Sequence, residues 1–246
     1  MAKVRADLLL VTRGLADSRA KAQAAIAAGG VTADGKVVAK ASEALEEDCA
    51  LTAQAAHPYV GRGALKLVHA LELWPVAVEG RVVLDVGAST GGFTEVCLER
   101  GASRVYAVDV GRGQLHPELA ADPRVTVLEG VDARTLTTEL IPEPPQLVVC
   151  DASFIGLAKV LPAALALAAP DADLIALVKP QFEVGPDHVG KGGIVRDAQA
   201  RARALADVAS FLTASGWIVR DTADSPIQGG DGNSEYLLHA RKSRPA

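Results

Sequence analysis

Seven short apolar segments, most of them rich in β-branched residues, recur from residue 82 onward and alternate with segments rich in alanine and leucine. The apolar segments are residues 82–86, 104–108, 125–128, 147–150, 174–178, 217–220 and 236–240. Runs this short and apolar are typical of strands buried on both faces of a sheet. The alternation therefore predicts an α/β fold, in which a doubly wound, seven-stranded sheet carries helices on both faces.

The part of the chain before residue 58 predicts a separate, small α+β domain. Ser18 is placed to cap a helix that ends before Gly29. Asp34 and Gly35 form the pair that favours a two-residue hairpin turn of type I′. A proline and two glycines then indicate a connecting segment. We therefore expect one domain at residues 1–57, a linker at 58–66 and a second domain at 67–246.

Charge and cysteine content narrow the class of protein. The formal net charge is −5, yet residues 1–40 hold seven Lys or Arg against three acids. This local surplus suggests a polyanion as the partner of the segment, but on charge alone a solvated charged face is the favoured interpretation. Cys49, Cys97 and Cys150 lie far apart, which fits reduced thiols and predicts neither disulfide nor metal site. No signal peptide and no membrane-length apolar run is visible. We expect a cytoplasmic protein with neither a membrane nor DNA as partner.

The stretch RADLLLVTRGLADSRAKAQAAIAAGGVTADGKVVAKAS resembles the S4 RNA-binding domain over its whole length. Ala6 stands where leucine is common, and Asp34 where asparagine is common. The resemblance implies that basic residues of this domain and of the linker contact structured RNA. These residues are Lys3, Arg5, Arg19, Lys21, Lys36, Lys40 and Arg62.

The stretch VLDVGASTGGFTEVCLERG reads as a strand, a glycine loop and a helix. Its spacing fails the dinucleotide fingerprint, and no Lys-Ser/Thr pair follows as in a phosphate-binding Walker loop. It resembles the first motif of class I S-adenosylmethionine methyltransferases, whose sheet is Rossmann-like. The resemblance implies cofactor contacts from Asp85, Gly87, Ala88, Ser89, Gly91, Gly92 and Phe93.

Two further acids follow successive predicted strands. Asp109 is placed to accept both ribose hydroxyls of the donor, and Asp132 to accept its adenine amino group. A single aspartate at a strand end is more often a helix N-cap. The succession of acids after neighbouring strands favours the cofactor interpretation.

Charged residues also stand at three more strand ends and in the linker. Asp151 follows the fourth strand and Lys179 the fifth, so their side chains meet at one edge of a parallel sheet. Glu235 opens the last strand, which is antiparallel in the class I fold, and Lys66 lies in the linker helix. Together they match the K-D-K-E tetrad of the FtsJ-like 2′-O-ribose methyltransferases. Lysines are rarely buried without partners or a role.

These pieces, with YVGRGALKL, CDASFIGL, LVKPQFEVG and GNSEYLL, together resemble the TlyA family, also known as haemolysin A. Gly61 and Ala64 depart from the serine and glycine that we expect there. The resemblance implies methylation of a cytidine 2′-hydroxyl in 16S rRNA, and in one subgroup also in 23S rRNA, within ribosomal subunits.

Some alternatives stay open at this stage. Lys179 either accepts the hydroxyl proton as a neutral amine or orients the hydroxyl as a cation. Residues 185–195 are glycine-rich and predict a mobile loop, in which His188 and Lys191 contact RNA or only solvent.

A base-amine methyltransferase is the main rival function, although no prolines follow Asp151. A non-catalytic RNA-binding protein would not need the tetrad. A pseudouridine synthase would not need the loop, and a haemolysin would need a membrane-active segment.

Overall fold

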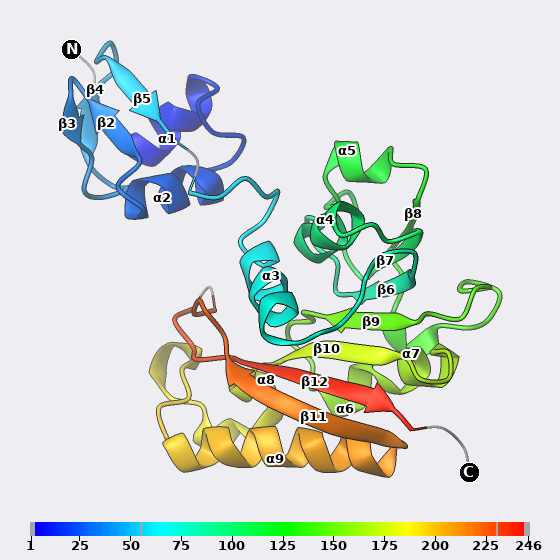
Figure 1. The fold of residues 1–246 in the computed structure, drawn as a ribbon. Helices are drawn as coiled ribbons and strands as arrows, with labels where there is room; N and C mark the ends of the chain where they lie inside the picture. Colours follow the sequence, from blue (N-terminus) through cyan, green and yellow to red (C-terminus); the bar gives the residue numbers. More distant parts are fainter. Residues whose placement is uncertain (1–2, 55, 230, 244–246) are drawn as a thin grey trace. The chain divides into compact units, whose positions relative to one another are not determined.

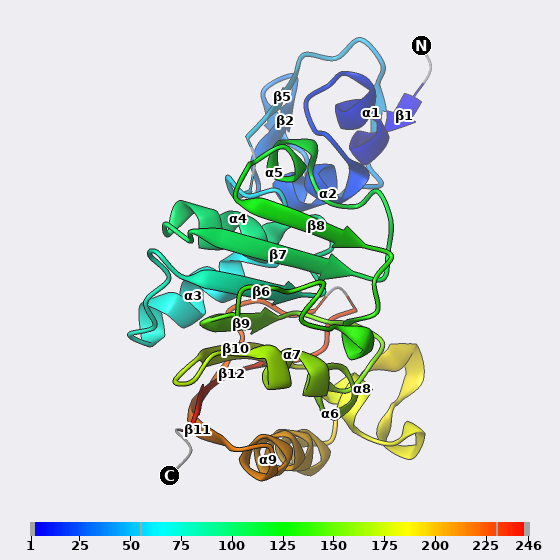
Figure 2. The same ribbon diagram turned by 90° about the vertical axis from the view of Figure 1, so that its right-hand side faces the viewer.

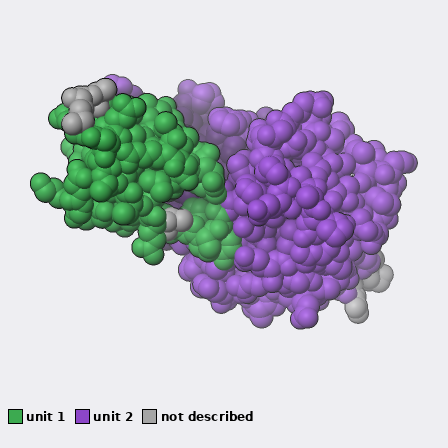
Figure 3. Space-filling view, turned by 90° about the horizontal axis from the view of Figure 1, so that it is seen from above, with its two compact units in different colours: residues 1–59 green, residues 60–246 purple. Residues whose placement is uncertain are grey.

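The computed structural model describes residues 3–54, 56–229 and 231–243. The chain divides into two compact units, Met1–Tyr59 and Val60–Ala246, which Figure 3 colours green and purple. Within the described ranges, no helix combines the length and the apolar character that crossing a bilayer requires.

In its described residues, 3–54 and 56–59, the first unit contains two helices and two small sheets (Figure 1). Its elements are β1 (Lys3–Arg5), α1 (Ala6–Thr12), α2 (Arg19–Ala27), β2 (Val31–Ala33), β3 (Lys36–Val37), β4 (Ala44–Glu46) and β5 (Leu51–Ala53). Strands β1 and β4 form a two-stranded sheet, and β3, β2 and β5 form a three-stranded one. The two helices pack over a core that includes Leu9, Leu10 and Ile26.

Local signals explain how these elements begin and end. The Ser18 hydroxyl accepts a hydrogen bond from the Lys21 amide at 3.3 Å and so caps α2, as predicted. Asp34 and Gly35 have φ of 48° and 76°, which are the two positive values that a type I′ turn requires. The sequence did not predict β1, β4 or β5, because three-residue strands carry no alternation to detect.

The second unit is a seven-stranded sheet with helices around it, so the predicted fold class is confirmed. The strands are β6 (Val82–Val86), β7 (Arg104–Asp109), β8 (Val125–Glu129), β9 (Leu147–Cys150), β10 (Asp173–Val178), β11 (Trp217–Asp224) and β12 (Tyr236–Lys242). The helices are α3 (Ala64–Leu73), α4 (Gly92–Glu99), α5 (Pro117–Ala120), α6 (Leu157–Val160), α7 (Pro162–Leu167), α8 (Pro180–Glu183) and α9 (Ala198–Ala214). Residues 64–66, which we expected in a linker, are thus the first residues of α3.

Alternation along the strands assigns the helices to two faces. Leu84 and Val86 of β6 lie in one core with residues of α6, α7 and α9. Asp85, between them, points the other way and contacts Thr94 of α4. Helices α3 and α4 pack on each other on that second face (Figures 1 and 2).

Strand order brings the candidate residues to one edge. The sheet runs β11-β12-β10-β9-β6-β7-β8, with β12 antiparallel to both neighbours and the other pairs parallel. Val178 at the end of β10 is paired with Tyr236 at the start of β12. The residues beyond this pair, Lys179 and Glu235, therefore leave the sheet at the same edge as the carboxyl ends of β6, β7, β8 and β9.

Candidate active site

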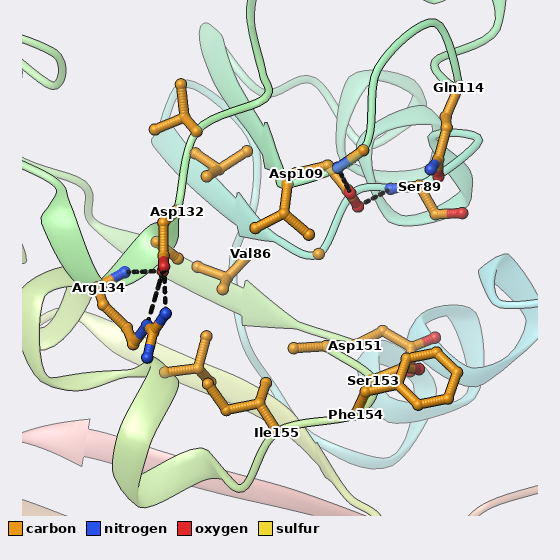
Figure 4. Close-up of a pocket in the computed structure, with 18 residues that line it drawn as sticks. Val86, Ser89, Asp109, Gln114, Asp132, Arg134, Asp151, Ser153, Phe154 and Ile155 are labelled. Atoms are coloured by element: carbon orange, nitrogen blue, oxygen red, sulfur yellow. Dashed lines mark hydrogen bonds and ion pairs between the residues drawn. The ribbon is translucent and has the colours of Figure 1, made fainter.

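A cavity of about 600 Å³ opens at the carboxyl ends of four neighbouring strands (Figure 4). Its walls come from the segments that follow β6, β7, β8 and β9. Its polar side chains include Ser89, Asp109, Asp132, Asp151 and Ser153. The volume is in the range of small-molecule and cofactor sites, and the carboxyl edge of an α/β sheet is where such ligands bind.

The glycine loop reaches the cavity through only part of its length. Gly87 and Ser89 line it. Gly87 has φ of +84°, and a Cβ there would lie 2.8 Å from Ala152 Cα, so glycine allows the two loops to meet. Gly92 allows another approach, because a Cβ on it would lie 3.0 Å from the Ala64 amide of α3. The predicted contacts Ala88, Gly91, Gly92 and Phe93 are buried and do not line the cavity, so their contact with the donor stays a prediction.

Asp85 also lies outside the cavity wall. Its side chain is fully buried beneath the loop, where the Thr94 hydroxyl donates to Oδ2 at 2.7 Å. Its Oδ1 has no hydrogen-bond partner among the described residues. Burial raises the pKa of this carboxyl from 3.8 to about 7. Asp85 is therefore placed to fix the start of α4, and its contact with the donor stays a prediction.

Asp109 presents a carboxylate to the cavity with spare acceptor capacity. The Ser89 amide donates to Oδ2 at 2.8 Å, and the Gly111 amide donates to Oδ1 at 2.7 Å. Each oxygen keeps a free lone pair, so two hydroxyls of a ligand can be accepted. Sequence reasoning missed Glu129, whose carboxylate accepts three backbone amides of residues 113–115 and so holds the adjoining loop.

Asp132 is both a cap of a short turn and a residue of the cavity wall, so it fits both the capping and the cofactor interpretation of its sequence position. It caps a short 3-10 turn by accepting the Arg134 amide at 2.9 Å, and it also lines the cavity. The Arg134 guanidinium lies 2.5 Å from Oδ2 and lowers the pKa of the carboxyl (Figure 4). Arg134 itself lines the cavity, and no sequence pattern pointed to it.

Beside the cavity, four charged side chains form a continuous chain of ion pairs. Lys179 Nζ lies 2.7 Å from Asp151 Oδ1, and Lys66 Nζ lies 3.6 Å from Asp151 Oδ2. Lys66 Nζ also lies 2.6 Å from Glu235 Oε2. Lys66, Lys179 and Glu235 are only 7%, 6% and 4% exposed. Removing charges from water costs several kcal/mol each unless they are paired, so this cluster is unusual for a purely structural edge.

Only one member of the chain reaches the cavity directly. Asp151 lines the wall, whereas Lys66, Lys179 and Glu235 do not. Lys179 Nζ also donates to the Asp151 carbonyl at 3.1 Å and to the Ser153 hydroxyl at 2.8 Å. Ser153, which sequence reasoning missed, is exposed and lines the cavity.

In the first unit, most of the predicted RNA-binding cations already have partners. Arg5 makes two hydrogen bonds of 3.0 Å to the fully buried Asp7, and Arg19 makes one of 2.9 Å. The bond from Arg5, with those from Gln23 and Arg19, holds the pKa of Asp7 well below its usual range. Arg5 and Arg19 are thus structural groups, whatever else they contact.

The remaining predicted RNA-binding residues differ in whether they already form an ion pair or a hydrogen bond. Lys21 pairs with Asp17 at 2.7 Å, and Lys3 with Glu46 at 3.5 Å. Arg62 belongs to the second unit, where its guanidinium donates to the Gln228 carbonyl at 3.3 Å. Within the described part of the chain, Lys36 and Lys40 are exposed and have no ion pair. They are the cations most available to a polyanion.

The basic surplus of residues 1–40 does not extend to the whole first unit. Residues 1–59 contain seven Lys or Arg and seven Asp or Glu, because four acids follow residue 40. Their formal net charge is therefore zero, and the −5 of the chain belongs to residues 60–246. A local cluster of cations, not the net charge of the unit, has to attract RNA.

The glycine-rich segment 185–195 is tied to the start of β12. The buried Asn233 accepts the Val195 amide at 3.0 Å and donates to the Gly193 carbonyl at 2.9 Å. His188 and Lys191 are exposed. The mobility of the segment and any contact of these two residues with RNA stay predictions.

Comparison with known proteins agrees with both units. Residues 59–242 match the FtsJ-like methyltransferase family, and residues 4–48 match the S4 domain. TlyA of Mycobacterium tuberculosis, a 16S/23S rRNA (cytidine-2′-O)-methyltransferase, is 51% identical over 97% of this chain and 90% of its own. Hemolysin A of Brachyspira hyodysenteriae is 38% identical over 96% of this chain and 99% of its own.

Solved structures give the same result for the fold. A solved structure from Streptococcus thermophilus has a TM-score of 0.78 at 38% identity, and the match covers 99% of this chain and 90% of that chain. The magnesium protoporphyrin IX methyltransferase of Synechocystis has a TM-score of 0.52 at 18% identity, over 74% of this chain and 84% of that chain. This second likeness is to the fold alone.

Proposed function

The chain belongs to the TlyA family of FtsJ-like methyltransferases, and from this premise we propose that it methylates a ribose 2′-hydroxyl of cytidine in rRNA. The methyl donor is S-adenosylmethionine, which supplies an electrophilic methyl group on a sulfonium. The observation that carries the proposal is the buried chain of four charged residues beside the cavity: Lys66, Asp151, Lys179 and Glu235.

Residues of the cavity fit the donor. Asp109 offers one free lone pair on each oxygen to neighbouring ribose hydroxyls. Asp132, held by Arg134, keeps its negative charge and faces the same cavity, where an adenine amino group would donate to it. Gly87 and Ser89 bring loop backbone to the cavity wall.

The ion-pair chain has the parts that activation of a hydroxyl requires. A ribose hydroxyl is a weak nucleophile until its proton is accepted. Lys179 is the proposed base, and Asp151 fixes its Nζ while also bordering the cavity. Lys66 and Glu235 complete the chain and fix Asp151 from its other oxygen. Transfer is then governed mainly by positioning, because the methyl group passes in line from sulfur to oxygen.

The first unit is the proposed RNA-binding module. Lys36 and Lys40 contact phosphates most directly, and Arg5 and Arg19 present the outer sides of guanidinium groups that Asp7 holds in place. Lys3 and Lys21 of this unit exchange intramolecular partners for RNA, and so does Arg62 of the second unit. The proposed substrate is rRNA within a ribosomal subunit, so the protein works in the cytoplasm.

Mapping the methyl group tests this function. The full chain is incubated with labelled S-adenosylmethionine and small or large bacterial subunits that lack the modification. Ribose methylation is recognised because the modified linkage resists alkaline cleavage, which needs a free 2′-hydroxyl. We expect labelled 2′-O-methylcytidine from 16S rRNA, and the large subunit tests 23S rRNA in the same assay. Label on a base amine would establish the rival function, and no label on either subunit would refute both.

A further inference from the structure

The proposed base lies outside the cavity in which the chemistry takes place. Lys179 is 6% exposed and is not part of the cavity wall. Three oxygen atoms surround its Nζ: Asp151 Oδ1 forms an ion pair with it at 2.7 Å, and the Asp151 carbonyl at 3.1 Å and Ser153 Oγ at 2.8 Å accept hydrogen bonds from it. A proton that leaves a hydroxyl in the cavity therefore has to pass one of these groups to reach Lys179.

The three groups differ in what they can do with a proton. A carbonyl only accepts hydrogen bonds, and the Asp151 carboxylate is held between two lysines. A hydroxyl can accept one proton while it donates another. Ser153 is also exposed and lines the cavity (Figure 4), and its Oγ accepts a hydrogen bond from Lys179 Nζ at 2.8 Å, so it contacts both the cavity and the proposed base.

Two contacts hold Ser153 in this place. Phe154, the next residue, has φ of +66°, a conformation that is strained for a bulky side chain. Its ring packs on Phe182 of α8 with centroids 5.3 Å apart. The Leu157 amide donates to Glu183 Oε1 of the same helix at 2.8 Å. Because α8 begins directly after Lys179, these contacts fasten the Ser153 loop to the segment that carries the base.

We propose that the Ser153 hydroxyl relays the ribose proton to Lys179, which makes Ser153 a catalytic residue of the proposed reaction. The step begins after the Lys179 ammonium has released one proton to solvent and the Ser153 hydroxyl has turned to donate to Nζ, the reverse of the hydrogen bond in the structure. The 2′-hydroxyl then gives its proton to Ser153 Oγ while Ser153 gives its own proton to the neutral Nζ of Lys179. The 2′-oxygen forms the bond to the methyl carbon, and the electron pair of the broken carbon–sulfur bond stays on sulfur. The products are the methyl ether, S-adenosylhomocysteine and the Lys179 ammonium, so protons and charge balance.

Single-turnover kinetics test the relay, which rests on the proposed function. Full-length Ser153→Ala should transfer methyl about 100-fold more slowly, as expected for loss of a proton-transfer group, while donor affinity stays unchanged. Ser153→Thr, which keeps a hydroxyl, should restore most of the rate. Ser210→Ala is the matched control, because Ser210 donates to the Ala206 carbonyl of its own helix and does not line the cavity. A wild-type rate for Ser153→Ala, or no rescue by threonine, would overturn the relay.

Two further measurements separate a relay from a structural role. The first is the methylation rate in mixtures of light and heavy water, plotted against the fraction of deuterium. For the wild type the plot should be curved, because two protons move in the step. For Ser153→Ala the plot should be a straight line. Hydrogen exchange of the Lys179 amine, measured by NMR without donor or RNA, should be slower in Ser153→Ala. A straight line for the wild type, or equal exchange, contradicts the relay. Wild-type protein that leaves ribose unmethylated refutes the proposed function instead, and the exchange measurement still tests the proton path.

Discussion

The two units use charged residues in opposite ways. In the first, a single buried acid, Asp7, holds two arginines whose side chains are 44% and 54% exposed. In the second, Lys66, Lys179 and Glu235 are themselves buried. Lys66 pairs directly with Glu235, and Asp151 pairs with both lysines. Exposed cations on a rigid anchor suit the binding of a polyanion, whereas a buried chain of charges suits proton transfer.

The difference extends to the acids that each unit buries. Asp7 is charged and its pKa is held low by the bond from Arg5. Asp85 has one donor, Thr94, and burial raises its pKa to about 7. The lesson is that burial alone does not decide the state of a carboxyl; the number and charge of its donors do.

The largest expected effect is on chemistry in the second unit. Lys179→Ala removes the proposed base and should lower the single-turnover methylation rate about 1,000-fold, within the range of general base catalysis. Donor affinity should change little, because Lys179 does not line the cavity. Lys159→Ala, an exposed lysine on α6, is the control. A variant that keeps a tenth of the wild-type rate would show that Lys179 is neither base nor essential for orientation.

The next effect is on the stability of the first unit. Arg5→Ala leaves the buried Asp7 without two of its hydrogen bonds and should lower the stability of this unit, although Arg19 and Gln23 still donate to Asp7. Hydrogen exchange of the α1 and α2 amides in the full chain measures it, with Lys36→Ala as the control.

Lowering the pH should also reduce the stability of the first unit in the wild-type protein. Because the pKa of Asp7 is lowered on folding, its contribution is complete above about pH 4 and is lost as the pH falls further. Unchanged protection of α1 and α2 in Arg5→Ala would mean that Asp7 does not anchor the unit.

A smaller effect concerns donor binding. Asp109→Ala removes an acceptor for two ligand hydroxyls and should weaken the affinity for S-adenosylhomocysteine about tenfold or more, measured by calorimetry. Glu118→Ala, an exposed acid on α5, should bind as the wild type does. Equal affinity for Asp109→Ala would show that another carboxylate holds the ribose.

The last effect is a change in the pH dependence of stability. Folding raises the pKa of Asp85 from 3.8 to about 7, so the folded state binds the proton more tightly than the unfolded state. This contribution is complete below about pH 4 and is lost as the pH rises to about 7. The stability of Asp85→Asn relative to the wild type should therefore increase between these pH values and then level off. A difference that is constant with pH would exclude a perturbed Asp85.

The strands of the large sheet and the residues at their ends could be predicted from the sequence, whereas individual side-chain contacts could not. All seven strands of the large sheet were predicted, because buried strands in an α/β fold are short, apolar runs. Strand ends also brought Asp151, Lys179 and Glu235 to one edge, although their roles stay predictions. Ser153 could not be found this way, since an exposed serine in a loop belongs to no pattern. The meeting of Arg5 and Arg19 on Asp7 depends on how α1 and α2 pack, which charge counting does not reveal.

The central claim is that the first unit supplies RNA affinity and the second supplies chemistry. Reversing the charge of Arg19 would be a poor test of this claim, because Arg19 donates a hydrogen bond to the buried Asp7 and its loss would also affect the stability of the first unit. Lys36→Glu with Lys40→Glu changes two exposed lysines that have no ion pair among the described residues. Both changes leave the charges around the cavity untouched.

The decisive measurement is binding to the ribosomal subunit as a function of salt, together with the single-turnover rate at saturating subunit. Each lost phosphate contact should reduce the slope of log affinity against log salt by about 0.7–0.9. We predict weaker binding and a flatter slope for the double variant, with an unchanged saturated rate. Wild-type affinity and slope, or a saturated rate that falls in step with the affinity, would contradict the division of tasks between the two units.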